Sequence, residues 1–260
     1  MTTAAEEGHS SATRALPYWL FAVIVAGYLA IIQVGGLLLN HAAGVDHTVA
    51  TTEGVLLNLW IPLGAALVYT YVVVTVLGWW RPVLREERRV RRWVWVVPVI
   101  FAVCALVAID YAALGEKTVG YVLALFVATQ FVGWGEEGMF RGIGVQTFRS
   151  HGLREGRVAL WSSAVFGAVH LSNAIGHGVQ ALPQAVAVSF AGYFFYLTRR
   201  VSGGNAVNSV LHGLFDFSIL TGTVVLVDQE PYVGSAAAIL AYLLVAGVLI
   251  ARRHHIELAR

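Results

Sequence analysis

Long hydrophobic runs separated by short polar stretches dominate this sequence. Eight runs are seen, at residues 17–39, 55–80, 93–114, 119–148, 158–175, 182–198, 206–227 and 235–251. A helix needs about 20 predominantly apolar residues to cross the hydrocarbon core of a bilayer, and these runs reach or approach that length. The pattern predicts an all-α fold, a polytopic membrane helix bundle with about eight transmembrane helices.

The composition is typical of a membrane protein. Of the 260 residues, 58% are hydrophobic and 12% are charged, and the mean hydropathy is +0.71. Soluble domains contain about 25% charged residues. The net charge of +2 gives no support for nucleic-acid binding, so membrane lipids are expected partners and nucleic acids are not. The single cysteine, Cys104, cannot form an internal disulfide and has no cysteine partner for a metal site.

The domain organisation is predicted by the same pattern. We expect a polar cytoplasmic tail at residues 1–16, one transmembrane domain at 17–251 and a second cytoplasmic tail at 252–260. The first hydrophobic run is longer than the about 7 to 15 apolar residues of a signal-peptide core, so it is interpreted as a span of the mature protein.

The distribution of basic residues predicts the orientation in the membrane. If both ends are cytoplasmic, 15 of the 17 Lys and Arg residues fall on the cytoplasmic side, while Lys117 lies outside and Arg141 lies within the fourth run. This asymmetry agrees with the positive-inside rule for an integral multi-pass protein of the plasma membrane. Six arginines within residues 81–92 are interpreted as an orientation signal in a solvated loop, with contacts to anionic lipid headgroups as the alternative.

Three ionisable residues interrupt the fourth hydrophobic run, namely Glu136, Glu137 and Arg141. Each charged side chain at membrane depth costs about 2.5 to 3.5 kcal/mol on insertion scales, so such residues indicate partners and function. The i,i+4 spacing of Glu137 and Arg141 places them on one helical face, where they can pair. Glu136 points about 100° away and is the carboxylate available for acid/base chemistry.

Two later runs carry histidines. Phe166 and His170 lie one turn apart, and His212 and Asp216 share a helical face. A lone buried histidine is usually a packing residue, but together with the two glutamates and the arginine these residues predict one polar site. Helical rise places it about 9 to 18 Å below the cytoplasmic surface, within reach of water from that side. Phe166 and Asn173 are candidate substrate contacts, and an outer-interface position is the alternative for Asn173.

The three patterns together resemble a known family. E-E-x-x-x-R at Glu136, Glu137 and Arg141, F-x-x-x-H ending at His170, and H-x-x-x-D beginning at His212 occur in this order within about residues 119–220. They are similar to the motifs of the CPBP intramembrane proteases, which include the type II CAAX prenyl endopeptidases. The resemblance implies an eight-span fold and hydrolysis of a peptide or protein substrate near the cytoplasmic membrane face. Family prenyl proteases cleave after a lipidated cysteine near the C-terminus.

The resemblance also implies roles for individual residues. Glu136 resembles the general base that activates a water molecule together with His170. Glu137 and Arg141 resemble the pair that braces the site. His212, with the residue four positions later, resembles the group that stabilises the developing oxyanion, which requires donors already aimed at the new charge.

Position 216 departs from the family pattern. Many relatives have Asn where this chain has Asp216, and an ionised carboxylate accepts hydrogen bonds but cannot donate them. Asp216 would then be protonated, orient His212 or bind a metal ion. A zinc interpretation therefore stays open, in which water fills the position left by protein ligands. Its candidate ligands are Glu136, His170, His212 and Asp216.

Two functions from other classes compete with the protease. Buried glutamate and histidine chains also relay protons in transporters. However, no repeat between the first four and the last four runs is recognisable, as transporters often show. The third interpretation is a non-catalytic membrane scaffold or bacteriocin-immunity protein with the same fold.

Overall fold

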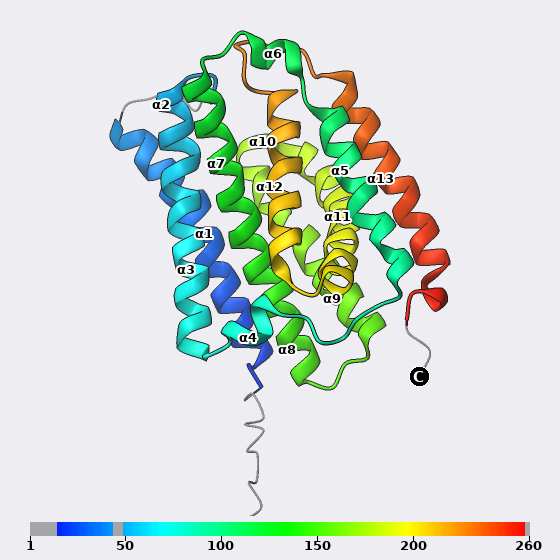
Figure 1. Cartoon of the computed structure of the whole chain (residues 1–260). Helices are drawn as coiled ribbons and strands as arrows, with labels where there is room; N and C mark the ends of the chain where they lie inside the picture. The colour runs from blue at the N-terminus through cyan, green and yellow to red at the C-terminus, as the bar shows by residue number, and fades with distance from the viewer. Residues whose placement is uncertain (1–14, 44–48, 258–260) are drawn as a thin grey trace, which may run out of the picture.

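The described part of the chain is helical. The computed structural model describes residues 15–43 and 49–257, where two isolated β-bridges are the only strand-like pairing (Figure 1). The main helices are α1 (Tyr18–Ala43), α3 (Ile61–Leu77), α5 (Val96–Ala108), α7 (Val119–Glu136), α9 (Glu155–Val169), α11 (Ala181–Ser202), α12 (Asn205–Thr221) and α13 (Val233–Ala251). Shorter segments are α2 (Thr52–Val55), η1 (Leu56–Trp60), α4 (Trp80–Leu84), η2 (Arg92–Trp95), α6 (Tyr111–Gly115), η3 (Glu137–Gly144), α8 (Val145–Ser150), η4 (His170–Asn173), α10 (Ala174–His177), η5 (Gly178–Gln180) and η6 (Arg253–His255).

Every predicted hydrophobic run is largely helical, which confirms the all-α fold class. Within the described residues, five helical stretches are long and apolar enough to cross a membrane, and Arg92–Ala108 is a shorter apolar helix. The five are Tyr18–Leu39, Thr52–Leu77, Val119–Ser150, Gly178–Ser202 and Val233–Ala251. Helices α9 and α12 have 15 and 17 residues, which span about 22 and 26 Å against a hydrocarbon core of about 30 Å. Eight crossings and two cytoplasmic ends therefore stay predictions. Residues 1–14 of the first predicted tail and 258–260 of the second lie outside the described residues.

Helices α7 and α12 cross at a pair of glycines. A Cβ atom added to Gly133 would lie 2.1 Å from the backbone oxygen of Ser209, and one added to Gly213 would lie 2.8 Å from that of Thr129. Small residues of this kind allow close approach of membrane helices. The crossing places the end of α7, with its two glutamates, beside the histidine of α12.

This crossing gives a testable packing prediction. We expect Gly133→Ala to destabilise the protein by about 1 to 3 kcal/mol or more, because its methyl group overlaps backbone that cannot rotate away. Gly120→Ala is the matched control, since it lies in the same helix with no atom within 4 Å of the added methyl. Thermal unfolding of the purified variants provides the measurement. Equal melting temperatures for the two variants would contradict the close crossing.

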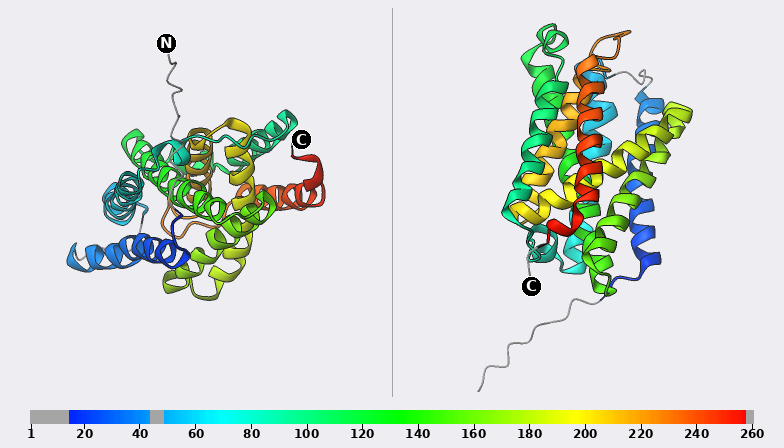
Figure 2. Two further views of the ribbon diagram at one scale, coloured as in Figure 1. Left: turned by 90° about the horizontal axis from the view of Figure 1, so that it is seen from below. Right: turned by 90° about the vertical axis from the view of Figure 1, so that its right-hand side faces the viewer.

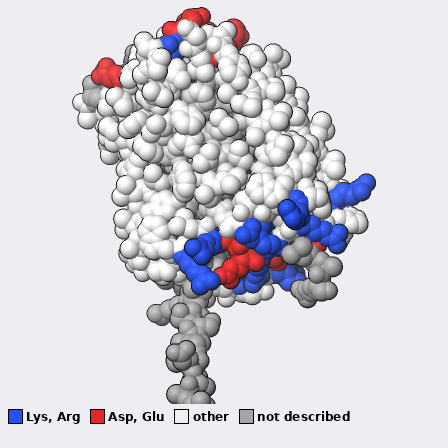
Figure 3. All heavy atoms as spheres, in the orientation of Figure 1, with Lys and Arg blue, Asp and Glu red and all other residues white. Residues whose placement is uncertain are grey.

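The bundle has one end rich in arginine. Helix α11 runs obliquely across the molecule in the right-hand view of Figure 2, while α13 stands upright. Figure 3 shows Lys and Arg side chains gathered at the lower end, below a broad band of uncharged residues. The last turn of α11 and the first turn of α9 both reach this end (Figure 1). We call it the arginine-rich end.

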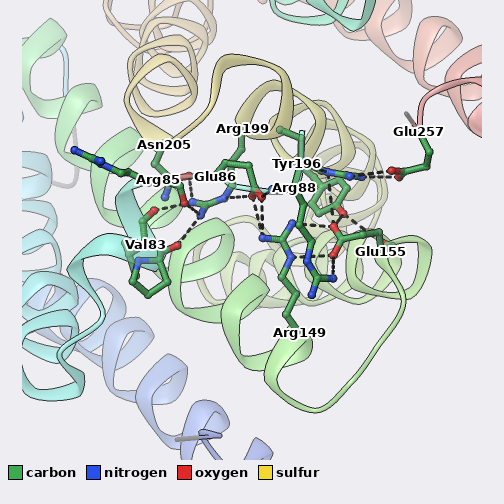
Figure 4. Close-up of polar contacts among 12 residues, drawn as sticks. Val83, Arg85, Glu86, Arg88, Arg149, Glu155, Tyr196, Arg199, Asn205 and Glu257 are labelled. Carbon is green, nitrogen blue, oxygen red and sulfur yellow. Dashed lines mark hydrogen bonds and ion pairs between the residues drawn. The ribbon is translucent and has the colours of Figure 1, made fainter. Parts of the chain in front are cut away.

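Ion pairs at this end form a connected group, which we call the ionic cluster (Figure 4). Its members are Glu86, Arg88, Arg149, Glu155, Tyr196, Arg199, Arg200 and Glu257. Glu86 accepts from Arg149 at 3.0 Å and from Arg199 at 2.9 Å. Glu155 accepts from Arg149 at 2.8 Å, and Arg200 binds Glu257 at 2.6 Å. The cluster joins α8, α9, α11, the loop after α4 and the segment after α13.

The ionic cluster changes the interpretation of the loop at residues 81–92 as solvated. Arg81 is 77% exposed and fits the expectation, but the Glu86 side chain is fully buried between Arg149 and Arg199. The Arg199 side chain, which the sequence assigns to a cytoplasmic loop, is 1% exposed. The reason is local neutralisation, since a buried charge is tolerated when it is paired and hydrogen-bonded.

The ionic cluster also predicts a pH dependence of stability. Burial alone would raise the pKa of Glu155, but hydrogen bonds and charge from Arg149, together with Tyr196 and Arg200, lower it from 4.5 to about 2. Because the pKa is lower in the folded state, the stabilisation is complete above pH 4.5 and is lost as the pH falls toward 2. Glu155→Gln should remove this part of the dependence, as measured by thermal unfolding at stepped pH. Glu87→Gln is the exposed control. If the stability of Glu155→Gln fell at low pH as steeply as that of the wild type, the assignment of this effect to Glu155 would be contradicted.

Candidate active site

The glutamates lie where the fourth run changes its helical winding. Helix α7 ends at Glu136, and the eight residues from Glu137 to Gly144 form the π-helix η3, in which every residue is buried. π-Helical turns have i→i+5 hydrogen bonds and frequently occur at functional sites. Glycines at 138, 142 and 144 let neighbouring side chains pack directly on this wide segment. The sequence predicted a continuous α-helix here and gave no signal for the change.

The carboxylate of Glu137 is the centre of the polar site. Its Oε1 accepts from Arg141 Nη1 at 3.1 Å and lies 2.8 Å from Nδ1 of His212. Its Oε2 accepts from the Asn208 side chain. The Glu137 and Arg141 side chains are both 0% exposed. The predicted Glu137–Arg141 pairing is therefore observed, and two further donors from α12 fix the same carboxylate.

Aromatic rings enclose the Arg141 guanidinium. Its central carbon lies 3.8 Å from the ring centre of Phe166 and 5.2 Å from that of Phe195. Such cation–π contacts are worth about 2 kcal/mol when they are desolvated. Gly192 makes room, because a Cβ there would lie 2.8 Å from Arg141 Nη2. Phe166 is 1% exposed, so the candidate substrate contact is a buried packing partner of Arg141 and both histidines.

His212 lies between three carboxylates. Its Nδ1 faces Glu137, while Nε2 lies 3.5 Å from Asp216 and 3.7 Å from Glu136. The ring stacks on Phe195 with a centroid distance of 4.4 Å and an angle of 18°. Because both nitrogens face acceptors, the doubly protonated imidazolium, which donates from each, matches this environment. Glu136 and Glu137 therefore share one imidazole, although the sequence placed them on separate faces.

His170 has a different hydrogen-bonding role. Its Nδ1 lies 2.8 Å from the backbone oxygen of Phe166, an acceptor, so Nδ1 carries the proton and Nε2 is left with its lone pair. The Phe166 ring centre lies 5.0 Å from that of His170 and 5.7 Å from that of His212. His170 is also close enough to interact electrostatically with Asp216 and His212. One imidazole is thus arranged to accept a proton and the other to donate.

Burial varies across the polar site. Glu137 and Arg141 are sealed, whereas the Glu136 side chain is 12% exposed and that of Asp216 is 30% exposed. Oε2 of Glu136 has no hydrogen-bond partner among the described residues. Asp216 lies farther along α12 from the arginine-rich end than His212 does. Entry of water from the cytoplasmic side stays a prediction.

Asn173 lies apart from the carboxylate group. Its side chain accepts from Gln33 at 3.0 Å and donates to Gln184 at 3.1 Å, which links η4 to α1 and α11. These two partners lie outside the site, so a role of Asn173 in substrate binding stays a prediction. Conversely, Asn208 contacts Glu137 directly but belongs to none of the three motifs. Its position four residues before His212 was the available signal, since i,i+4 residues share a face.

The donor set does not match a metal centre as it is arranged. Within the described residues, no group of three or more His, Cys, Asp or Glu side chains is placed to hold a metal ion. Both nitrogens of His212 face carboxylates, and Nδ1 of His170 is directed at a backbone oxygen. The zinc interpretation stays a prediction, and no reaction step is derived from it.

A large groove lies outside this site. It has a volume of about 760 Å³ and is lined by α9, α11 and the end of α13, including Leu160, Phe190 and Ile250. None of the six charged or imidazole residues of the predicted site lines it. The groove and the predicted site therefore have none of these six residues in common.

Comparison with known proteins supports the resemblance seen in the motifs. Residues 117–218 match the family model described as Type II CAAX prenyl endopeptidase Rce1-like. The matched segment contains the three motifs and therefore all the residues that meet at Glu137, His170 and His212. No match was found among curated proteins or among solved structures. The resemblance to the CAAX endopeptidases is thus confirmed for this segment, and it supports a protease of the intramembrane kind.

Proposed function

We propose that this protein is an intramembrane endopeptidase that hydrolyses a peptide bond with water activated by Glu136 and His170. The observation that supports the proposal best is the division of roles within one site. Glu136 has a buried oxygen to which none of the described residues donates, Nδ1 of His170 faces a backbone oxygen so that Nε2 keeps its lone pair, and His212 faces acceptors from both nitrogens. Proton acceptors and a proton donor are the complementary groups that acyl transfer to water requires.

The reaction uses each group in its observed position. Water attacks the peptide carbonyl carbon while its proton passes to Glu136, with His170 as the second acceptor. The carbonyl oxygen gains negative charge as the tetrahedral intermediate forms, and His212 donates to it. The C–N bond then breaks, and the proton held by Glu136 passes to the leaving nitrogen. The remaining hydroxyl proton of the new carboxyl group passes to Nε2 of His170, so that a carboxylate and an amine are released. Glu137 stays ionised and holds His212 and Arg141 in place.

Asp216 fits this proposal as an orienting group. With its Oδ2 3.5 Å from His212 Nε2, it accepts rather than donates. Asn at this position would add a donor, whereas Asp strengthens the cationic form of His212. The departure from the family pattern is therefore compatible with hydrolysis, with His212 as the main donor to the oxyanion.

A peptide panel tests the proposal. Protein in nanodiscs is incubated with a peptide lipidated at a C-terminal cysteine, the same peptide without lipid and a transmembrane peptide, and products are identified by mass spectrometry. Cleavage of one class is the expected result, and metal analysis with and without a chelator tests the zinc interpretation in the same samples. Proton flux in proteoliposomes without any cleavage would favour a transporter. Biological activity retained in Glu136→Gln would favour a scaffold or immunity protein.

A further inference from the structure

A buried chain of hydrogen bonds runs from the ionic cluster to the polar site. It starts at Glu86 and passes through Arg199 to Asn205 (Figure 4). Glu86 is 4% exposed, Arg199 is 1% exposed and Asn205 is 0% exposed. Asn205 then donates to the backbone oxygen of Glu137 at 2.9 Å. Two regions that are distant in the sequence are thus joined by polar contacts without intervening solvent.

Every N–H donor of the Arg199 guanidinium makes a hydrogen bond. A guanidinium has five N–H donors. Those of Arg199 make five hydrogen bonds, to the Glu86 carboxylate, the Asn205 side chain and the backbone oxygens of Pro82, Val83 and Arg85. The three backbone oxygens belong to the end of α4 and its C-terminal cap, where no further helical turn donates N–H groups to them. No other side chain type can satisfy this set in a fixed geometry.

Asn205 is the connecting residue. Its Oδ1 accepts from Arg199 at 2.7 Å, and its Nδ2 donates to Glu137, so both ends of one amide are engaged. Glu137 is the residue at which the α-helical winding of α7 changes to the π-helix η3. The hydrogen bond from Asn205 to the Glu137 carbonyl therefore fixes the backbone at the position that sets the directions of the Glu136 and Glu137 side chains.

We propose that Asn205 and Arg199 are positioning residues that hold the backbone of Glu137, and through it Glu136, in the geometry needed for reaction. The inference rests on the proposed function for its kinetic consequence, while its structural consequence stands alone. Neither residue touches the reacting atoms. A displacement of about 1 Å in a reacting group can cost about 100-fold in rate.

Asn205→Asp separates positioning from folding. The aspartate still accepts from Arg199 and adds charge attraction to it, and an acidic residue in the first turn favours the helix dipole of α12. It cannot donate to the Glu137 carbonyl. Arg199→Lys is the second variant, because lysine keeps the charge but supplies only three donors. Arg200→Lys is the matched control, since Arg200 is equally buried in the ionic cluster and contacts Glu257 and Arg88 but not Asn205.

The experiment combines kinetics with hydrogen exchange. In the folded protein we expect Asn205→Asp to lower kcat by about 100-fold with KM near wild type, and Arg200→Lys to leave kcat unchanged. Backbone amides of residues 137–144 should exchange faster in Asn205→Asp and Arg199→Lys than in the control. Wild-type kcat and exchange in Asn205→Asp, or equal losses in Arg200→Lys, would overturn the proposal while leaving the peptidase intact. If the wild-type protein cleaves no peptide, the proposed function fails and the exchange comparison alone decides the positioning role.

Discussion

Replacement of Glu136 by glutamine is expected to lower kcat for peptide cleavage by about 10²- to 10⁴-fold, the usual contribution of a general base. Glutamine has nearly the shape of glutamate, so packing at the end of α7 is retained. It cannot take a proton from water at neutral pH. The Glu136 side chain is 12% exposed, its ion pair with His212 is long at 3.7 Å, and its Oε2 makes no hydrogen bond within the described residues, so little structure depends on it.

The measurement is single-turnover cleavage by protein in nanodiscs, with melting temperature recorded for each sample. Glu87→Gln serves as the control, because its side chain is 76% exposed and pairs only with the exposed Arg81. We expect wild-type kinetics from the control. Cleavage by Glu136→Gln at the wild-type rate would exclude this residue as the base.

The second large effect is expected for Arg141→Met. Removing one partner of a buried ion pair leaves an uncompensated charge and typically costs about 3 to 5 kcal/mol. Here Glu137 would keep His212 and Asn208 as donors but lose the guanidinium that pairs with it. Methionine replaces the aliphatic part of the side chain but not the guanidinium that lies over Phe166. Unfolding should therefore occur at a markedly lower temperature, and cleavage should be lost in the remaining folded protein.

A double variant identifies the cause. Glu137→Gln combined with Arg141→Met removes both charges, so part of the lost stability should return while cleavage stays absent. Arg88→Met is the comparison for an exposed pair, since Arg88 is 52% exposed and surface pairs contribute about 0 to 1 kcal/mol. A loss of similar size in Arg88→Met and Arg141→Met would contradict the central role of the buried pair.

Local periodicity predicted the contacts that lie within one helix. The i,i+4 rule correctly paired Glu137 with Arg141, at 3.1 Å, and His212 with Asp216, at 3.5 Å. The same rule did not predict that Glu136 and Glu137 both lie beside His212, because that contact depends on the packing of α12 beside the end of α7. Crossing helices bring residues together at points that no single period in the sequence encodes.

Long-range polar contacts were less accessible to sequence reasoning. Charge asymmetry alone predicts that Arg199 and Arg200 lie in a cytoplasmic loop. The structure buries them because Glu86, Glu155 and Glu257 come from three distant segments to neutralise them. Pairing partners more than 40 residues apart cannot be selected without the fold. The motif spacing nevertheless located the correct segment, as the family match at residues 117–218 shows.

The π-helix between Glu137 and Gly144 makes the length of this segment as important as its composition. Deleting one residue at 142–144, after the last residue of the first motif, would allow the backbone to return to an i→i+4 ladder, which is the more stable winding. Closing the wide turn would shift Glu137 and the residues before it relative to α12. Both glutamates would turn away from His212 although every motif residue is still present. Insertions and deletions here are therefore expected to abolish cleavage as completely as substitution of the base itself.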